Sequence, residues 1–566
     1  MGPGGRPQAD EGAGAARPRP GLSALRRTRL SAPGLLVAAA FFALSMTPSM
    51  VPRAPLLQGV LGGVAAGIGY LVWTGLAGAL RWMGERPRRA PSPPVQAALA
   101  AAAALLAAAG LGMGAGWQGS ILAAWGQPPA GTGAPLRVAL TAGAVFAGLL
   151  ALGGVFRRLA GLWQRRGRRF LPQRPARVLG VVAAAAVFAA VIDGVAMRAL
   201  LRAADTSARL ADQMIPPDTS PPVSPLVSGG PGSPLDWREM GRWGRSFVAS
   251  GPDAAAIGGF WGAPARQPIR VYVGLNAADT AEARARLAFD ELVRLGGFGR
   301  SVLVIAMPTG SGWLDPGGVD TLDYMTRGDV ATVSVQYSYL PSPVSVVVDP
   351  AQGRAEAQAL FDVVYRHWTA LPRDARPRLY LYGLSLGAFL SQETVPMLDL
   401  YADPIDGALW VGSPYLGEFW RMVQDRRRPD SPVWRPRFGN GSLIRTTNQS
   451  GGLERFDADW GPMRFVFLQY GSDPIVFFDW SLAWSRPAWL TGPRAPDVSP
   501  QMRWIPVVTL LQVGLDMAVA LGTLGYGHDY AARDYIPAWA ATLDPPGWTP
   551  EDGARLAAHL ANLVPR

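Results

Sequence analysis

The chain contains no cysteine and no lysine, and it has only three histidines. The lack of cysteine excludes disulfides, thiolate metal sites and a cysteine nucleophile. Three histidines are too few for a histidine-rich metal cluster, and we expect neither a metal ion nor a cofactor. Without lysine there is no Gly-Lys-Ser/Thr segment, so the glycine-rich stretches cannot form a phosphate-binding P-loop.

Charged residues are also scarce, since they make up 17% of the chain while hydrophobic residues make up 49%. That balance indicates a membrane part, and a length of 566 residues indicates two or more domains. The net charge of +12 is uneven: residues 1–200 hold 21 arginines and four acidic residues, which leaves a net −5 for the remainder. The arginines flank apolar segments, which is typical of a membrane protein and argues against a nucleic-acid partner.

Five apolar stretches precede residue 201, and each is long enough to cross a bilayer as a helix. They are Leu35–Val51, Leu56–Leu80, Val95–Trp117, Val138–Val155 and Val178–Leu200. We therefore predict a basic arm over residues 1–30 and a transmembrane helical domain over residues 31–200.

The arginines predict the orientation of this domain. The basic arm and the connections after the second and fourth stretches hold most of them, whereas the other two connections hold only Arg53 and Arg137. The positive-inside rule then predicts a cytoplasmic N-terminus, and five crossings predict that the chain after residue 200 lies outside the cytoplasm. A cleaved signal peptide is the alternative for the first stretch, but further apolar stretches follow it at once.

Residues 201–235 are polar and rich in proline, which indicates a linker or a loosely packed strap. Short apolar segments and helical segments alternate from residue 236 to 566 and predict a doubly wound α/β domain with a mostly parallel sheet. The predicted strands are Ile269–Leu275, Val302–Ala306, Ala331–Gln336, Arg378–Tyr382, Gly407–Val411 and Arg464–Gln469. The predicted helices are Ala281–Leu295, capped by Asp279 or Thr280, Ala355–Ala370 and Leu386–Leu398.

Two predicted insertions, residues 413–462 and 479–524, interrupt this alternation. The second contains the apolar run Trp504–Leu521, which has the length of a sixth crossing. Gln512 and Asp516 lie within the run, and a crossing would separate its two flanks across the bilayer. We therefore predict a buried or interfacial helix there.

One serine is set in a distinctive segment, Gly383-Leu384-Ser385-Leu386-Gly387, between a predicted buried strand and a predicted helix. A sharp Gly-x-Ser-x-Gly turn in this setting exposes the serine hydroxyl at the carboxyl end of the strand and directs a helix N-terminus toward it. Ser385 is therefore the predicted nucleophile.

A serine nucleophile needs a base and an acid that orients the base, and in this type of fold they follow in the order Asp or Glu, then His. Asp473 directly follows a predicted strand, with a turn-capping role as the alternative. His528 lies in the glycine-rich segment Gly525–Tyr530, which suits an imidazole that reaches across the sheet. His559 has the right order but lies on a predicted terminal helix, and His367 precedes the serine.

The developing oxyanion also needs backbone donors. The first predicted donor is the amide of Leu386, directly after the nucleophile. The others are predicted in the loop after the strand Val302–Ala306, at Gly310, Ser311 and Gly312, where an ordinary glycine turn is the alternative.

Several segments together resemble a known family, the bacterial transmembrane α/β-hydrolases, which fuse a multi-helix membrane domain to a serine-hydrolase-like domain. The matching segments are Pro268–Leu275, Pro308–Pro316, Gln336–Ser342, Gly383–Gly387, Asp406–Gly412, Ser472–Ile475 and Gly525–Tyr530. The resemblance implies that Ser385, Asp473 and His528 occupy the catalytic triad positions. Together with the predicted orientation, we expect a multi-pass protein of the bacterial inner membrane with an extracytoplasmic or periplasmic catalytic domain. Family members often have Glu before the nucleophile, where this chain has Leu384.

The leading hypothesis is a membrane-anchored serine hydrolase that cleaves a carboxylic ester outside the cytoplasm through an acyl-enzyme. Its partners would be the lipid bilayer and an acyl-ester substrate, and the Trp-containing insertions would form a lid that favours an apolar acyl chain. One alternative is an acyltransferase that uses the same triad and passes the acyl group to an envelope alcohol. The other is a non-catalytic membrane scaffold or transport component. The sequence does not predict the oligomeric state.

Overall fold

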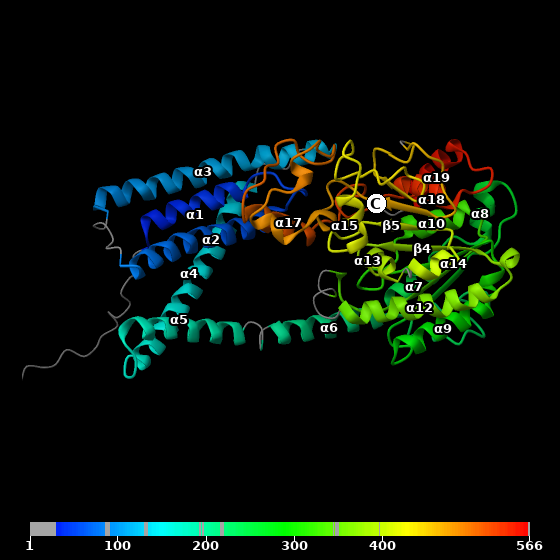
Figure 1. Ribbon diagram of the computed structural model, residues 1–566, viewed down its shortest axis with the longest axis horizontal. Helices are drawn as coiled ribbons and strands as arrows, with labels where there is room; N and C mark the ends of the chain where they lie inside the picture. The colour runs from blue at the N-terminus through cyan, green and yellow to red at the C-terminus, as the bar shows by residue number, and fades with distance from the viewer. Residues whose placement is uncertain are drawn as a thin grey trace, which may run out of the picture.

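The computed structural model describes residues 30–84, 91–128, 134–191, 194, 197–215, 220–342, 345, 350–394, 397–454 and 456–563. The chain forms two parts that lie end to end, a helical bundle within residues 31–200 and an α/β domain within residues 236–566 (Figure 1). The predicted basic arm lies outside the described residues except for Leu30.

Three helices of the described chain are long and apolar enough to cross a membrane, fewer than the five crossings predicted. They are α2 (Pro55–Trp82), α3 (Pro93–Ala124) and α4 (Ala134–Gly167). The first predicted stretch gives only α1 (Ala32–Ser45), 14 residues long, because Pro48 and Pro52 follow and the chain continues as a loop. A helix of that length rises about 21 Å, short of the roughly 30 Å of a hydrocarbon core. The fifth gives α5 (Gln173–Ala189), after which residues 192–193 and 195–196 are not described.

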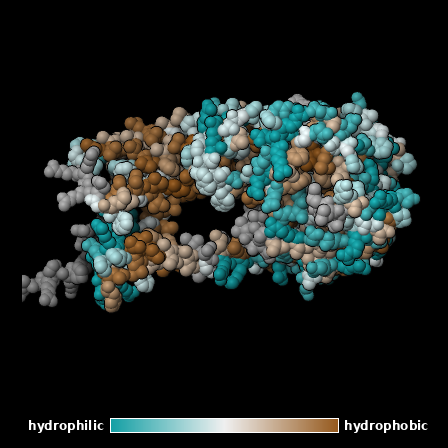
Figure 2. Space-filling view, viewed as in Figure 1, coloured by the Kyte–Doolittle hydropathy of each residue, from teal (hydrophilic) through white to brown (hydrophobic). Residues whose placement is uncertain are grey.

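The bundle has two different ends. Met50 and Val51, in the loop between α1 and α2, and Trp125, at the end of α3, belong to the same buried cluster as the core of the α/β domain. The beginning of α1, the end of α2, the beginning of α3 and the α4–α5 connection lie at the opposite end (Figure 1). Apolar surface gathers over the bundle, whereas the α/β domain presents a mainly hydrophilic surface (Figure 2).

The predicted linker is partly helical. Helix α6 (Met197–Gln213) continues toward the α/β domain and packs on α7 (Gly241–Ala249). Its Asp212 is buried, and one carboxylate oxygen accepts a hydrogen bond from the Arg242 amide at 3.0 Å. The proline-rich composition therefore describes only the later part of residues 201–235.

The α/β domain contains a seven-stranded, entirely parallel sheet in the order β1-β3-β2-β4-β5-β7-β6. The strands are β1 (Ile269–Val273), β2 (Val302–Met307), β3 (Val330–Val335), β4 (Arg378–Leu384), β5 (Gly407–Val411), β6 (Ile444–Thr447) and β7 (Arg464–Leu468). All six predicted strands are present. The seventh, β6, lies inside the predicted insertion 413–462, so part of that segment belongs to the sheet.

Helices cover both faces of the sheet, as expected for a doubly wound domain. Helices α9 (Ala281–Arg294) and α12 (Pro350–Ala370) pack together on one side, and α10 (Pro316–Met325), α18 (Ala532–Leu543) and α19 (Pro550–Leu563) pack together on the other (Figure 1). Of the two predicted caps of α9, Thr280 is the one used, and its hydroxyl accepts from the Ala283 amide.

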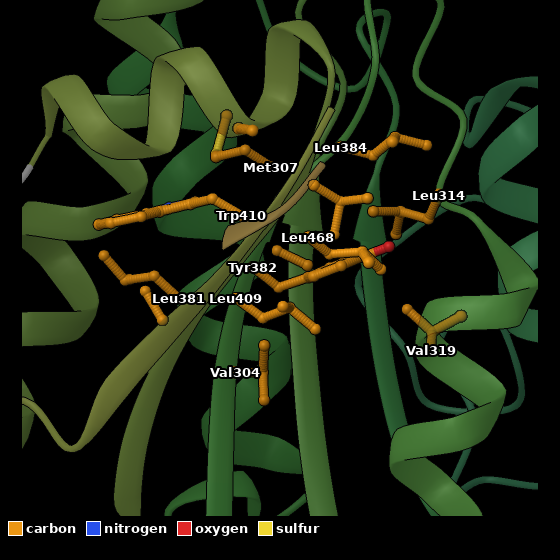
Figure 3. Close-up of a cluster of buried hydrophobic side chains, with 14 of the residues drawn as sticks. Val304, Met307, Leu314, Val319, Leu381, Tyr382, Leu384, Leu409, Trp410 and Leu468 are labelled. Atoms are coloured by element: carbon orange, nitrogen blue, oxygen red, sulfur yellow. The ribbon is translucent and has the colours of Figure 1, made fainter. Parts of the chain in front are cut away.

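The core lies in the central strands. Val304, Leu381, Leu409 and Leu468 come from four strands and are fully buried (Figure 3). Strands buried on both faces have continuous apolar sequences, which is why the sequence pattern identified them.

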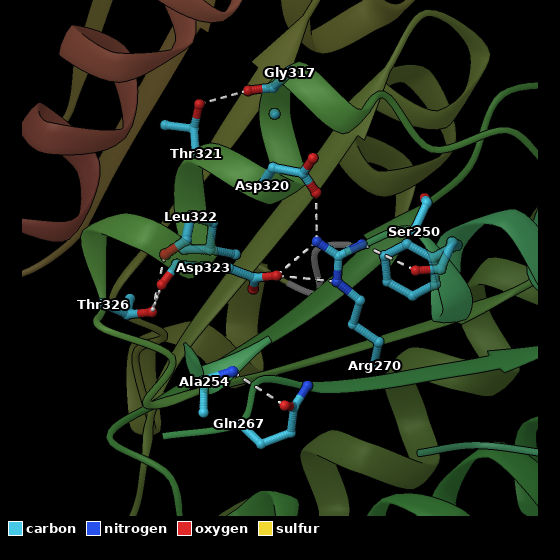
Figure 4. A network of polar contacts seen from close by, with 12 residues as sticks. Ser250, Ala254, Gln267, Arg270, Gly317, Asp320, Thr321, Leu322, Asp323 and Thr326 are labelled. Carbon is cyan, nitrogen blue, oxygen red and sulfur yellow. Dashed lines mark hydrogen bonds and ion pairs between the residues drawn. The ribbon is translucent and has the colours of Figure 1, made fainter. Parts of the chain in front are cut away.

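A buried ion-pair network fixes the edge of the sheet. Arg270 on β1 pairs with Asp320 at 2.5 Å and with Asp323 at 2.6 Å, and both acids lie on α10 (Figure 4). Burial raises the pKa of Asp323 to about 6 despite the opposing effect of the Arg270 guanidinium. The network joins the first strand to a helix that begins just after the β2 loop.

The apolar run in the second predicted insertion forms α17 (Val508–Met517), a helix of 10 residues and not a crossing. Helix α17 packs on α1 and α2. Gln512 donates to the Thr47 carbonyl at 2.9 Å, and Asp516 forms a buried ion pair with Arg53 at 2.7 Å. The bundle and the α/β domain therefore share a polar, buried interface.

Candidate active site

Ser385 occupies the sharp turn between β4 and α13 (Leu386–Glu393). Its φ of 58° and ψ of −124° are unusual for a residue with a side chain and indicate a strained backbone. A Cβ at Gly387 would come within 2.1 Å of the Met307 carbonyl oxygen, so only glycine allows α13 to begin this close to β2. The turn thus fixes Ser385 at the carboxyl end of the central strand.

Asp473 follows β7 and has two roles, one for each carboxylate oxygen. Its Oδ1 accepts from the Ile475 amide at 2.9 Å and caps the short helix α16 (Pro474–Phe477). Its Oδ2 lies 2.7 Å from Nδ1 of His528. The capping and catalytic interpretations of this aspartate are therefore compatible.

The His528 imidazole lies at the carboxyl end of β5, the strand between the one that leads to Ser385 and the one that leads to Asp473. Its Cε1 is 2.6 Å from the position that a Cβ would take at Gly412, directly after β5. The other ring nitrogen, Nε2, is buried and has no hydrogen-bond partner among the described residues.

Ser385 and His528 both lie at the carboxyl ends of the central strands, but they are not hydrogen-bonded to each other in the described structure. The Ser385 amide donates to the Val411 carbonyl at 2.8 Å, next to the Gly412 that underlies the imidazole. Ser385 is 2% exposed and His528 is 6% exposed. The structure therefore brings Asp473 and His528 into contact and leaves the serine close by in a closed site.

Tyr530 is a site residue that the sequence interpretation did not identify, although it ends the segment that contains His528. Its hydroxyl donates to Asp473 Oδ2 at 2.8 Å and accepts from the Tyr470 amide at 3.2 Å. Burial raises the pKa of Tyr530 well above its ordinary value, and the Asp473 carboxylate raises it further. Tyr530 therefore keeps its proton and remains a donor to Asp473.

Further bonds tie the loops that carry Asp473 and His528 to each other. The Gly527 amide donates to Ser472 Oγ at 3.0 Å, and the Ser472 amide donates to Asp497 Oδ2 at 2.8 Å. Asp497 lies in the second predicted insertion and was also not identified from sequence. Its position relative to Ser472 depends on tertiary structure, and no local pattern reveals it.

The predicted oxyanion donors differ in their availability. The Gly310 amide donates to Ser342 Oγ at 2.9 Å, and the Gly312 amide donates to the Thr309 carbonyl at 2.9 Å. Both amides are therefore engaged, that of Gly312 within its own turn and that of Gly310 with the segment after β3. In the described part of the chain, the amides of Leu386 and Ser311 have no acceptor.

The other two histidines lie elsewhere. His559 lies on α19, where its Nε2 is 3.0 Å from the Tyr324 hydroxyl. His367 lies on α12, and its ring packs on Phe298. The described residues contain no group of three or more histidine, aspartate or glutamate side chains suited to a metal ion.

Comparison with known proteins agrees with this architecture. A family model described as the alpha/beta-hydrolase family matches residues 269–556, and one described as the N-terminus of an alpha/beta-hydrolase family matches residues 46–252. No curated protein and no solved structure matches the chain.

Proposed function

Because the chain belongs to the alpha/beta-hydrolase family, we propose that it is a membrane-anchored serine hydrolase that cleaves a carboxylic ester outside the cytoplasm. The observation that carries the proposal is the 2.7 Å contact between Asp473 Oδ2 and His528 Nδ1, at the carboxyl ends of the strands where Ser385 also lies. A carboxylate, an imidazole and a serine in this order are the parts that acyl transfer requires.

In the proposed reaction His528 Nε2 takes the Ser385 proton while Ser385 Oγ attacks the ester carbonyl. Asp473 accepts the hydrogen bond from the Nδ1–H group of His528 and stabilises the imidazolium that forms. The Leu386 amide, at the N-terminus of α13, donates to the oxyanion, and Ser311 is the available donor of the loop after β2. The alcohol leaves with the proton from His528. Water, activated by the same imidazole, then hydrolyses the acyl-enzyme.

A membrane lipid or a similar amphiphile is the proposed substrate class. The insertion 479–524 packs on the bundle through α17 and exposes large apolar side chains. These are Trp480, Trp484, Leu521 and Leu524. Exposed tryptophan and leucine beside membrane helices favour contact with the interfacial region of a bilayer. Because Ser385 is buried, loops must move before an ester reaches it.

The charge distribution supports the proposed orientation. Among the described residues, the arginine-rich α4–α5 connection and Arg81 at the end of α2 lie at the end of the bundle farthest from the α/β domain (Figure 1). By the positive-inside rule this end faces the cytoplasm, so the α/β domain lies on the opposite side of the membrane.

The test is labelling of the full-length protein in membranes with a fluorophosphonate probe, which reacts with an activated serine. We expect the wild type to be labelled and Ser385→Ala not to be. Ser391→Ala, a buried serine on the same helix, is the matched control and should retain labelling. An unlabelled wild type would contradict the proposal.

Product analysis separates hydrolysis from transfer. With an acyl-ester substrate in membranes, a hydrolase releases the free acid whether or not an alcohol is added. Acyl transfer to added glycerol or sugar, lost in Ser385→Ala, would identify an acyltransferase instead.

A further inference from the structure

The domain-facing end of the bundle contacts the α/β domain through the end of α3. Trp125 Nε1 donates to the Asp497 carbonyl at 2.9 Å, and Ser120 Oγ lies 2.7 Å from Ser499 Oγ. The Trp125 ring also stacks on Tyr526, with ring centroids 5.0 Å apart and an angle of 13° between the planes. Trp125 is buried, so these contacts are shielded from solvent.

One partner of Trp125 belongs to the loop that carries His528, and the other contacts the loop that carries Asp473. Tyr526 lies two residues before His528. Asp497 accepts from the amide of Ser472, which directly precedes Asp473.

A side-chain amide links these two partners to each other. Gln449 Nε2 donates to Asp497 Oδ2 at 3.2 Å and to the Gly525 carbonyl at 3.0 Å. Trp125 is thus connected to the His528 loop directly through Tyr526, and to the Asp473 loop through Asp497.

A second connection reaches His528 through α17. Asp516 is held by the Arg53 ion pair and by the Met50 amide, which donates to it at 3.1 Å. Shortly after α17 ends, the Ala520 carbonyl accepts a hydrogen bond from the His528 amide at 2.9 Å. The loop before α2 therefore fixes the helix whose end supports the histidine.

We propose that the domain-facing end of the bundle is part of the active-site scaffold, and that Trp125 is a positioning residue that aligns the loops of Asp473 and His528. This inference rests on the proposed function, since it concerns the same site. It assigns the bundle a role in catalysis in addition to anchoring.

The imidazole is sensitive to such alignment because few hydrogen bonds fix it. Its Nδ1 is held by Asp473, its Nε2 has no partner among the described residues, and its backbone is held by Ala520. Proton transfer requires Nε2 to meet the serine hydroxyl within hydrogen-bond reach, and small displacements of reacting groups lower rates steeply.

The test compares three variants of the full-length protein. Trp125→Ala removes the stack and the hydrogen bond, and Trp125→Phe keeps an aromatic ring on Tyr526 but removes the N–H donor. Trp117→Ala is the matched control, because Trp117 lies on the same helix and packs within the bundle. The measured quantities are the rate constant of fluorophosphonate labelling and its final amplitude. Loss of folded protein lowers the amplitude, whereas misalignment lowers the rate constant.

We expect the Trp125→Ala rate constant to fall by about 10- to 100-fold, with Trp125→Phe restoring most of it. Trp117→Ala should stay within about twofold of the wild type, because it removes no contact to the triad loops. A Trp125→Ala rate constant equal to that of the wild type, or an equal loss in Trp117→Ala, would overturn the inference.

A second measurement does not depend on activity. The chain has only three histidines, so selective ¹⁵N-histidine labelling gives a simple spectrum. Trp125→Ala should shift the signals of His528 and leave those of His367 and His559 in place, whereas an unchanged His528 would contradict the inference. If the wild type is not labelled by the probe, the proposed function fails, and the histidine spectrum still reports whether Trp125 aligns the loop.

Discussion

Tyr530 donates to the same carboxylate oxygen of Asp473 that contacts His528. Tyr530→Phe removes this bond and keeps the ring. A hydrogen bond to a charged group contributes about 1.5–3 kcal/mol. We expect kcat to fall by roughly tenfold with little change in KM, because the hydroxyl orients Asp473 and does not contact the substrate.

Steady-state kinetics with a chromogenic ester in membranes checks this prediction. Tyr401→Phe, a change at a fully exposed tyrosine, is the control. A Tyr530→Phe enzyme with the wild-type kcat would show that Asp473 is held by its other contacts alone.

For single residues, the sequence identifies those that lie in a recognisable local sequence pattern. Ser385 lies in a strand–turn–helix pattern, and Asp473 and His528 follow in the expected order along the chain. Asp497 lies in no such pattern, because it reaches Ser472 only through tertiary packing. The engaged amides of Gly310 and Gly312 could not be predicted either, since glycine content indicates a turn and not its hydrogen bonds.

Among the elements, the continuous apolar strands were predictable and the strand β6 was not. Residues 444–447 include Arg445 and two threonines, so they lack the apolar run that marks the other strands. Their strand conformation comes from pairing with β7. Likewise, the helical part of the predicted linker, α6, is stabilised by Asp212 contacts with α7 that no local pattern reveals.

Asp315 links two elements of the α/β domain and makes the stability of their contact depend on pH. It caps α10 by accepting from the Gly317 amide at 2.8 Å, and it accepts from the Tyr535 hydroxyl of α18 at 2.7 Å. Burial raises its pKa to about 7, although both hydrogen bonds oppose the shift. In the unfolded chain the pKa is about 3.9.

The raised pKa means that the folded state keeps a proton which the unfolded state loses between about pH 4 and pH 7, so stability falls as the pH rises through this range. Asp315→Asn removes this dependence. Its stability relative to the wild type should therefore increase by about 2–3 kcal/mol between pH 5 and pH 8. Thermal unfolding at the two pH values measures the difference, with Asp290→Asn on the exposed face of α9 as the control. A difference that does not change with pH would contradict the assignment.

For the whole molecule, composition predicted a membrane part followed by an α/β domain, but not the way the two parts join. Gln512 and Asp516 argued against a sixth crossing, and their partners turn out to be Thr47 and Arg53 of the bundle. Polar residues in an apolar run indicate buried partners without identifying them. The end of α1 takes part in the same interface, since the Ser45 carbonyl accepts from the side chains of Gln58 and Gln512.

The orientation of the whole molecule gives the last prediction. The chain has no cysteine, so single-cysteine variants need no altered background. Phe170, between α4 and α5, is 87% exposed, and Tyr401, in the α/β domain, is 93% exposed. If the arginine-rich end faces the cytoplasm, a membrane-impermeant maleimide added to intact spheroplasts should label Tyr401→Cys, and should label Phe170→Cys only after permeabilisation. The reverse pattern would put the active site in the cytoplasm, and labelling of both in intact spheroplasts would mean that the bundle does not separate the two ends across a membrane.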